Sequence, residues 1–268
     1  MNKARVTRIF ILILVSALLT SCATVPVTGR RSLNLIPDAE LARMSLESYR
    51  KVIDEAELST DPAQLERVRR VGDRIARATV SYLRAHQLPY DQFQWEFNVI
   101  QDDEQVNAWA MPGGKIAVYT GILPVSENDA GLAAVLGHEI AHVLAKHGNE
   151  RMSRALLVEL GGQTLSAATR QRPAWTSNLL LASYGAGAQV GVLLPHSRLQ
   201  ESEAGHIGLI LMAIAGYDPR AAIGLWQRMG QVGGSRPPSF LSTHPQPQAR
   251  IADMQRHMPE AIAIYEGR

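Results

Sequence analysis

The segment VLGHEIAHVLAKH, residues 135–147, constrains what this chain can fold into more than any other. It places His138 and His142 four residues apart, and such positions lie one above the other on one face of an α-helix. Apolar residues recur around this pair with a helical period: Leu132, Val135, Leu136, Ile140, Val143 and Leu144. We therefore predict a core helix that begins near Asn128, ends at Gly148 and directs both imidazoles toward one point.

The residue between the histidines indicates what the pair can do. Two imidazoles one helical turn apart can bind one metal ion, whereas Glu139 lies about 100° further around the helix. That offset is too large for a third ligand, but the carboxylate can reach a water molecule beside the ion. A hydrolytic zinc site needs this division of roles. Two histidines of an ordinary core helix are the alternative, but the intervening Glu139 favours one Zn²⁺ per chain with Glu139 as general base.

A third ligand is expected from the later segment LQESEAGHIG, residues 199–208. Glu201 and Glu203 are acids on a predicted helix that is otherwise apolar, and a buried carboxylate is costly unless it is paired or binds a metal. The residues alone leave the choice between the two open. His147 lies on a different face at the end of the predicted histidine helix, where we expect it to interact with the helix dipole.

The N-terminus has the form of a signal peptide. A basic start is followed by an apolar run from Ile9 to Leu19 of 11 residues, well short of the roughly 20 that a spanning helix needs. The sequence LTSC that ends at Cys22 resembles a bacterial lipobox, which implies cleavage before this cysteine and its lipidation. An incidental cysteine is the alternative. Acyl chains would hold the protein on a membrane without spanning it. By the same resemblance, Ala23 favours the outer membrane, facing the periplasm.

Charge and cysteine content exclude other classes. Cys22 is the only cysteine, so the chain forms no internal disulfide. Removal of the signal peptide takes away Lys3, Arg5 and Arg8, which leaves 24 of the 27 basic side chains against 25 acidic ones. The mature chain is then close to neutral, and it offers no electrostatic case for nucleic acid as a partner.

The rest of the chain predicts an α+β fold dominated by helices. Strands are expected within residues 93–100 and at 115–119, with Pro112-Gly113-Gly114 as a turn, and most other segments have a helical period. Residues 231–247 are rich in Gly, Pro and Ser, which predicts a loop, and 248–258 a last helix. We expect a signal peptide over 1–21, an extended arm over 22–37 and a single domain over 38–268 with a small sheet next to the histidine helix.

Six segments, spread over nearly all of the mature chain, together resemble one family. They are PVTGRRSLNLIP, NAWAMPGGKIAVYTGIL, LGHEIAHVLAKH, SRLQESEAGHIGL, AGYDP and STHPQPQARI. The family comprises zinc metallopeptidases that include the HtpX heat-shock protease, the Ste-type CAAX prenyl protease, Oma-type peptidases and the periplasmic beta-barrel assembly-enhancing protease. Its later motif is Glu-x-x-Ala-Asp, which implies Glu201 as third zinc ligand and leaves Glu203 as a neighbour. The motif's Asp, which would hold a zinc-bound histidine by a hydrogen bond, is Gly205 here.

The resemblance also implies roles outside the metal ligands. The strand that binds substrate would be Asn107, Ala108, Trp109, Ala110, Met111, Pro112, Gly113 and Gly114. His244 would approach the zinc as a fourth ligand and block the catalytic water, although a simple turn histidine is an equal alternative. His196 and Arg250 are candidates for stabilising the oxyanion. We expect His86, His206 and His257 to be surface or packing residues.

The resulting expectation is a zinc endopeptidase of the bacterial envelope. The resemblance implies misfolded or unassembled envelope proteins as substrates, in protein quality control, and the outer-membrane assembly machinery as a partner. A second hypothesis is a chaperone or binding module with weak or latched proteolysis, which Gly205 favours. A structural zinc protein fits less well, because closed structural sites are usually rich in cysteine.

Overall fold

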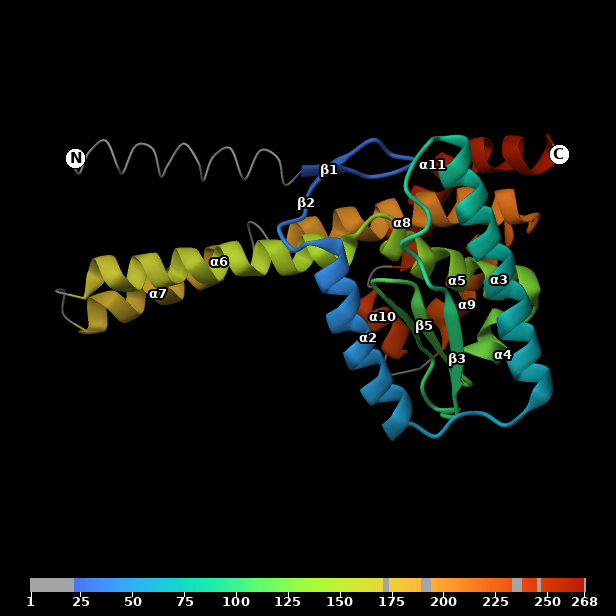
Figure 1. Cartoon of the computed structure of the whole chain (residues 1–268), viewed down its shortest axis with the longest axis horizontal. Helices are drawn as coiled ribbons and strands as arrows, with labels where there is room; N and C mark the ends of the chain where they lie inside the picture. The colour runs from blue at the N-terminus through green and yellow to red at the C-terminus, as the bar shows by residue number, and fades with distance from the viewer. Residues whose placement is uncertain (1–21, 171–173, 189–193, 233–237, 245–246, 268) are drawn as a thin grey trace. The chain divides into compact units, whose positions relative to one another are not determined.

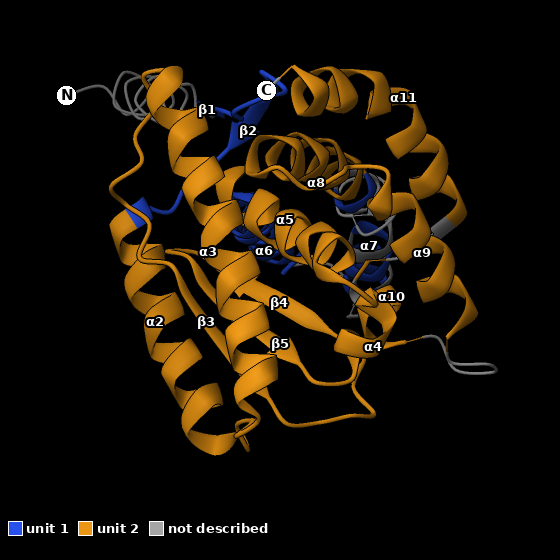
Figure 2. Cartoon of the chain, turned by 90° about the vertical axis from the view of Figure 1, so that its right-hand side faces the viewer, with its two compact units in different colours: residues 1–38, 146–198 blue, residues 39–145, 199–268 orange. Residues whose placement is uncertain are grey.

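The computed structural model describes residues 22–170, 174–188, 194–232, 238–244 and 247–267, so the predicted signal peptide lies outside it. It confirms a helix-dominated α+β fold (Figure 1). The contacts group into two compact units (Figure 2). Unit 1 comprises residues 1–38 and 146–198, and unit 2 comprises residues 39–145 and 199–268. The single domain over 38–268 stays a prediction.

Unit 2 contains a three-stranded sheet of β3 (Glu96–Ile100), β4 (Ala108–Met111) and β5 (Lys115–Tyr119). The strand order is β3-β5-β4, with β3 parallel and β4 antiparallel to β5. Gly113 and Gly114 form the predicted turn at φ of 90° and 91°, a region that favours glycine. A Cβ atom at Gly114 would also lie only 2.8 Å from the ring of Trp95. The result is a hairpin that leaves β4 at one edge of this sheet.

Two helices of unit 2 begin at residues whose side chains cap them. Asp61 Oδ1 accepts a hydrogen bond from the backbone N–H of Ala63 at 2.9 Å, and Asn128 Oδ1 accepts one from Gly131 at 3.0 Å. The helices of this unit are α2 (Asp38–Glu55), α3 (Pro62–Ala85), α4 (Ile122–Ser126), α5 (Asp129–Leu144), α8 (Leu194–Ala215), α9 (Ala221–Gln231), α10 (Ser239–Thr243) and α11 (Pro247–Glu266). The first residue of α2 and the first turn of α8 belong to unit 1.

The core of unit 2 surrounds α5. Every residue from Gly131 to Leu144 is buried, because α5 packs against α3, α9 and β4 together. The predicted apolar stripe therefore covers only one face of a helix that is in fact buried on all sides. Its polar side chains His138, Glu139 and His142 are consequently held in a dry, close-packed interior.

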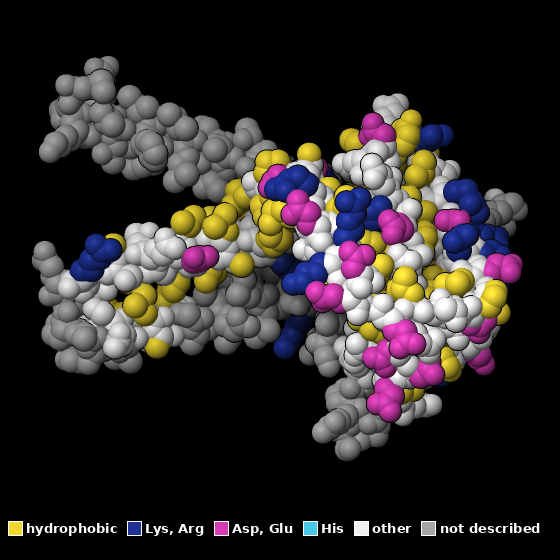
Figure 3. Space-filling view, turned by 60° about the horizontal axis from the view of Figure 1, so that its bottom comes forward, with side chains coloured by type: hydrophobic (Ala, Val, Ile, Leu, Met, Phe, Trp, Pro, Cys, Tyr) yellow, Lys and Arg dark blue, Asp and Glu magenta, His cyan; other side chains and the backbone are white. Residues whose placement is uncertain are grey.

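Unit 1 contains a small sheet and a helical hairpin. The sheet is two-stranded and antiparallel, with β1 (Cys22–Thr24) and β2 (Arg31–Leu33), and the arm over 22–37 stays a prediction. The hairpin consists of α6 (His147–Thr169) and α7 (Ala174–Ala188), and a Cβ atom at Gly161 would collide with the Tyr184 hydroxyl. Exposed apolar side chains lie along it: Met152, Leu156, Leu157, Leu160 and Leu180 (Figure 3).

The predicted C-terminal end of the histidine helix is wrong. The histidine helix ends at Leu144 rather than Gly148, because Lys146 adopts the left-handed turn at φ 55° while its ammonium group pairs with Asp38 at 2.5 Å. His147 then begins α6 and is fully buried, and its interaction with the C-terminal dipole of α5 stays a prediction.

The predicted loop at 231–247 also contains a short helix. Residues 239–243 form α10, because Phe240 is fully buried and its ring lies 5.5 Å from that of Trp226. The last helix, α11, is longer than predicted and runs through Pro259 to Glu266. None of the helices in the described residues combines the length and apolarity that a membrane span requires.

Candidate metal centre

The candidate metal centre lies where α5 crosses α8. A Cβ atom added at Gly208 would lie 3.2 Å from backbone atoms of Gly137 and His138, so two glycines allow the helices to approach closely. Glu201 is two turns before Gly208 on the same face of α8. The close crossing therefore places this carboxylate beside the histidines of α5.

Four buried side chains converge there: His138, His142, Glu201 and His244, with ligand atoms within 4.8 Å of one another. Nε2 of His138 lies 3.1 Å from Nε2 of His142 and 3.2 Å from Nδ1 of His244. The carboxylate of Glu201 completes the cluster, at 3.4 Å from His138 and 3.3 Å from His142. The structure thus brings together the two motif histidines, the expected third ligand and the expected fourth.

This arrangement fits a metal ion better than it fits hydrogen bonds alone. One ring nitrogen carries at most one proton, yet Nε2 of His138 has three close polar neighbours within 3.4 Å in the cluster. Ligands about 2.0–2.1 Å from a tetrahedral zinc ion lie roughly 3.3 Å apart. The observed separations of 3.1, 3.2, 3.3 and 3.4 Å match that spacing.

Burial sets the charge state of the ligands. Burial lowers the pKa of His138 to about 3, so its imidazole is neutral and can donate a lone pair at physiological pH. Burial alone would raise the pKa of Glu201. The charge of His142 and hydrogen bonds with His138 and His244 outweigh it, so the pKa falls well below the ordinary carboxyl range. A neutral imidazole beside an ionised carboxylate is the form that binds Zn²⁺.

Glu139 occupies the position expected of a base. Its side chain is buried, and its Oε1 lies 3.4 Å from Nε2 of His244. Because His244 itself lies in the metal cluster, the Glu139 carboxylate faces the place that a fourth ligand, or a water molecule instead of it, would take.

His244 is held over the cluster by α10. Its backbone N–H donates to the carbonyl oxygen of Phe240 at 2.8 Å, and its ring lies 4.4 Å from the Phe240 ring. Nδ1 of His244 lies 2.8 Å from Oε2 of Glu201. The two sequence alternatives for this residue, a turn histidine and a fourth ligand, are therefore geometrically compatible, since it ends a short helix and also enters the cluster.

Arg250 lies against the centre from α11. Its guanidinium bonds the Glu201 carboxylate, donates to the Glu201 carbonyl oxygen at 3.2 Å and stacks 4.4 Å above the Trp226 ring. Its role as an oxyanion stabiliser stays a prediction.

The side chain of His196, another predicted site residue, lies outside the described residues, while Glu203 is buried. Sequence reasoning missed Trp226, whose only signal was an aromatic residue in a periodic helix.

Gly205 stands where the family motif has an aspartate. It lies one turn after Glu201 and one turn before Gly208 on α8. Nδ1 of His138 is buried and has no hydrogen-bond partner among the described residues. A Cβ atom at Gly205 would meet only Met254, at an ordinary 3.5 Å. The space for a side chain is therefore present, but the group that would hold the histidine is missing.

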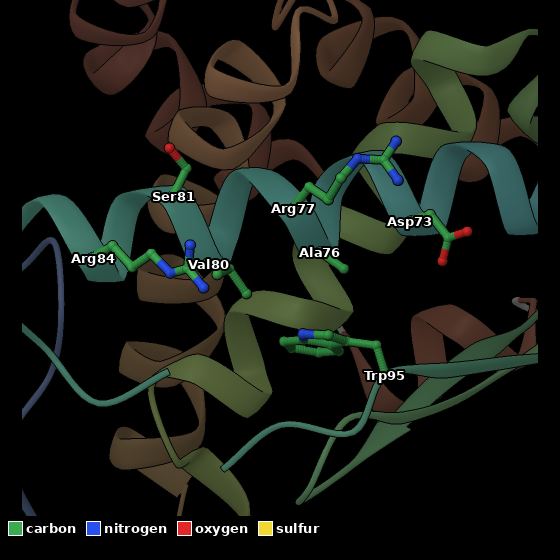
Figure 4. Close-up of a pocket in the computed structure, with 7 residues that line it drawn as sticks. All are labelled: Asp73, Ala76, Arg77, Val80, Ser81, Arg84 and Trp95. Carbon is green, nitrogen blue, oxygen red and sulfur yellow. The ribbon is translucent and has the colours of Figure 1, made fainter. Parts of the chain in front are cut away.

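A separate hollow of about 490 Å³ lies beside α3, outside the metal centre (Figure 4). It is lined by Asp73, Ala76, Arg77, Val80, Ser81, Arg84 and Trp95. None of the predicted site residues lines this hollow, so the metal centre is built from the crossing of helices rather than from this open pocket.

Comparison with known proteins agrees with the geometry. The model of peptidase family M48 matches residues 62–258. The mitochondrial metalloendopeptidase OMA1 of Schizosaccharomyces pombe is 37% identical over 245 residues, which cover 88% of this chain and 66% of that protein. OMA1 of Saccharomyces cerevisiae is 38% identical over 183 residues, 66% of this chain and 50% of that protein.

A bacterial relative is more distant. The beta-barrel assembly-enhancing protease of Escherichia coli is 28% identical over 242 residues, 87% of this chain and 47% of that protein. The chain thus spans about half to two thirds of the length of these relatives. Its match to the family model extends from α3 to α11 and includes all four residues of the metal cluster. The chain belongs to peptidase family M48, whose members depend on zinc.

Proposed function

We propose that this chain is a zinc endopeptidase in which His138, His142 and Glu201 hold the ion and Glu139 is the general base. The observation that carries the proposal is the set of ligand separations of 3.1 to 3.4 Å around His138, which suits one tetrahedral ion. The M48 match supports the same chemistry.

The protein groups have distinct parts in peptide hydrolysis. When bound, Zn²⁺ would acidify a water molecule and polarise the scissile carbonyl. Glu139 accepts the proton from that water and passes it to the leaving amine. Arg250 fixes the Glu201 carboxylate, because its guanidinium bonds Oε2 of this group and rests on Trp226. Burial of all these groups excludes competing water.

An extended substrate would pair with β4, within the predicted segment from Asn107 to Gly114. This strand is at the edge of the sheet and packs against α5, which carries the histidines. Pairing through backbone hydrogen bonds gives binding with little sequence preference, which suits unfolded substrates.

His244 would act as a latch on this centre. A nitrogen ligand in the fourth position would displace the catalytic water, and the position of His244 in the cluster supports such a closed state. The latch is also tied to the substrate strand: the backbone N–H of Phe240 donates to Val106 at 3.0 Å, and Ser239 Oγ donates to Gln105 at 3.0 Å. A peptide that pairs with β4 would disturb these contacts and release His244.

The site of action that we propose is the bacterial envelope, at the periplasmic face of the outer membrane. The lipobox at Cys22 supports this location, as does the similarity to the beta-barrel assembly-enhancing protease of Escherichia coli. Exposed leucines along α6, in the same unit as Cys22, suit a membrane-proximal position. Misfolded or unassembled envelope proteins would be the substrates, and the outer-membrane assembly machinery a partner.

Cleavage of an unfolded reporter protein tests the enzymatic part. The chain from Ala23 onward, loaded with zinc, should cleave the reporter, and Glu139→Gln should not. Equal cleavage by both proteins would contradict the role of Glu139. Labelled fatty acid tests the location: the full chain should incorporate it in a bacterial host and Cys22→Ala should not.

A binding module that cleaves poorly is the second candidate. Gly205 in place of the motif's Asp and the unpartnered Nδ1 of His138 favour it. It predicts that Glu139→Gln retains the function of the chain in the cell. The endopeptidase predicts that this variant loses it.

A further inference from the structure

A second cluster of metal-binding side chains lies on α8 and α11. His206, His257 and Glu260 each offer a ligand atom, and these atoms lie within 4.8 Å of one another. Nε2 of His206 lies 2.7 Å from Oε2 of Glu260. The rings of His206 and His257 are stacked, with centroids 3.8 Å apart and planes inclined by 14°. No residue of this cluster belongs to the catalytic centre.

The cluster closes one end of a seam between the two helices. Figure 2 shows the two helices, α8 and α11. Side-chain contacts join them in order along the seam: Glu201 with Arg250, Ser202 with Asp253, and His206 with both His257 and Glu260. The two partners on α11 are three residues apart, so they share one helix face. Three potential ligands are thereby held on two rigid helices rather than on a loop.

The chemistry of the three groups suits a borderline transition-metal ion. Two imidazoles and a carboxylate bind Zn²⁺, Ni²⁺ or Cu²⁺, whereas Mg²⁺ and Ca²⁺ prefer oxygen ligands alone. Burial, and next the charge of His206, lowers the pKa of His257, so this imidazole is neutral and its lone pair is available at neutral pH. Glu260 is 55% exposed, which leaves room for water ligands and gives an ion access from solvent.

We propose that His206, His257 and Glu260 form a second, peripheral site for Zn²⁺ that clamps α8 to α11. Ligands about 2.1 Å from one ion lie no more than about 4.2 Å apart, so the 4.8 Å cluster must close by side-chain rotation. The stacked rings must splay so that their lone pairs converge. The clamp stabilises the seam whose other end holds Arg250 against Glu201, and thus stiffens the catalytic centre without touching it.

Zinc stoichiometry tests the proposal on the full chain purified in detergent. After equilibrium dialysis against micromolar buffered zinc, the unmodified protein should hold two Zn²⁺ per chain. His257→Ala and Glu260→Gln should each hold one, and so should His142→Ala, which loses the catalytic ion instead. His86→Ala is the matched control, since it removes a histidine outside both clusters, and it should keep two.

Thermal unfolding provides an independent readout. Added Zn²⁺ should raise the melting temperature of a protein whose catalytic site is already filled, and Glu260→Gln should abolish that rise while folding normally, because its side chain is exposed. The proposal is overturned if the unmodified protein holds only one Zn²⁺. It is equally overturned if both His257→Ala and Glu260→Gln retain the second ion.

Discussion

The two histidine clusters of this chain contain the same kinds of ligand in opposite surroundings. His138, His142, Glu201 and His244 are at most 8% exposed and lie among packed helices. His206 and His257 are half-buried near the surface, and Glu260 is more than half exposed. The side chains of the first cluster cannot relax away from one another, whereas those of the second can rotate into water.

This difference in burial teaches what makes a metal centre catalytic. In the buried cluster, desolvation lowers the pKa of His138 to about 3 and the surroundings hold each ligand in place. At the surface, solvent weakens the same forces, and a bound ion would fill its shell with water. On this account, the buried cluster would bind an ion tightly with Glu139 facing the position of the fourth ligand, while the surface cluster would act only as a clamp.

Removal of a buried ligand should have the largest effect. His142→Ala leaves His138 and Glu201 without their central partner, so zinc is lost from the catalytic centre and cleavage falls to background. Metal analysis and reporter cleavage measure the two effects, with His86→Ala as a control that changes neither. Catalytic zinc retained in His142→Ala would remove this residue from the ligand set.

Removal of the base should separate binding from catalysis. Glu139→Gln keeps the volume of the side chain but cannot accept a proton, so kcat should fall by roughly 10²- to 10⁴-fold. Metal analysis should find the zinc content unchanged. Loss of zinc in this variant would mean that Glu139 is a ligand rather than the base.

Restoring a carboxylate next to the buried cluster should strengthen it. Gly205→Asp restores the carboxylate of the family motif one turn after Glu201. We expect it to reach the unpartnered Nδ1 of His138, so metal affinity should rise by about 10- to 100-fold. Competition with a chromogenic chelator measures the affinity. Gly205→Asn has nearly the same shape and no charge, and it should give a smaller gain. A fall in affinity with Gly205→Asp would show that the aspartate does not reach the imidazole.

Releasing the fourth ligand should open the buried cluster. His244→Ala removes the nitrogen 2.8 Å from Glu201, and cleavage should rise by roughly tenfold, within the range typical of coupled sites. Initial rates on the unfolded reporter measure it. A rate below that of the unmodified chain would assign His244 to catalysis instead of to a latch.

A lower pH should weakly destabilise the folded protein through His257 of the surface cluster. His257 faces His206, Glu260, Asp253 and Arg256, and burial is the main cause that lowers its pKa in the folded state. The unfolded chain therefore takes up the proton first, and stability is lost as the pH falls from about 6.5 through the folded pKa. Metal-free His257→Gln should show a smaller loss of melting temperature between pH 7 and pH 5. If the melting temperature of His257→Gln falls as much as that of the unmodified chain, His257 is not a source of the acid destabilisation.

The sequence predicts these regions unequally. The spacing of His138 and His142 encodes their shared helix face, and the caps at Asp61 and Asn128 encode two helix starts. Local patterns did not reveal that Lys146, rather than a glycine, takes the left-handed turn, because a pairing with distant Asp38 decides it.

Contacts between helices were still harder to predict from the sequence. Glu201 could be separated from Glu203 only by resemblance to a family, since the crossing at Gly137 and Gly208 selects which acid reaches the histidines. The surface cluster gave no signal at all, because His206 and His257 meet only after α8 and α11 have packed together.

Zinc-edge anomalous diffraction from crystals of the active protein tests the central claim most directly. We predict a strong peak about 2.0–2.2 Å from Nε2 of His138, Nε2 of His142 and a carboxylate oxygen of Glu201. An active crystal with no anomalous peak among these three side chains would contradict the assignment of the buried cluster as the catalytic zinc centre.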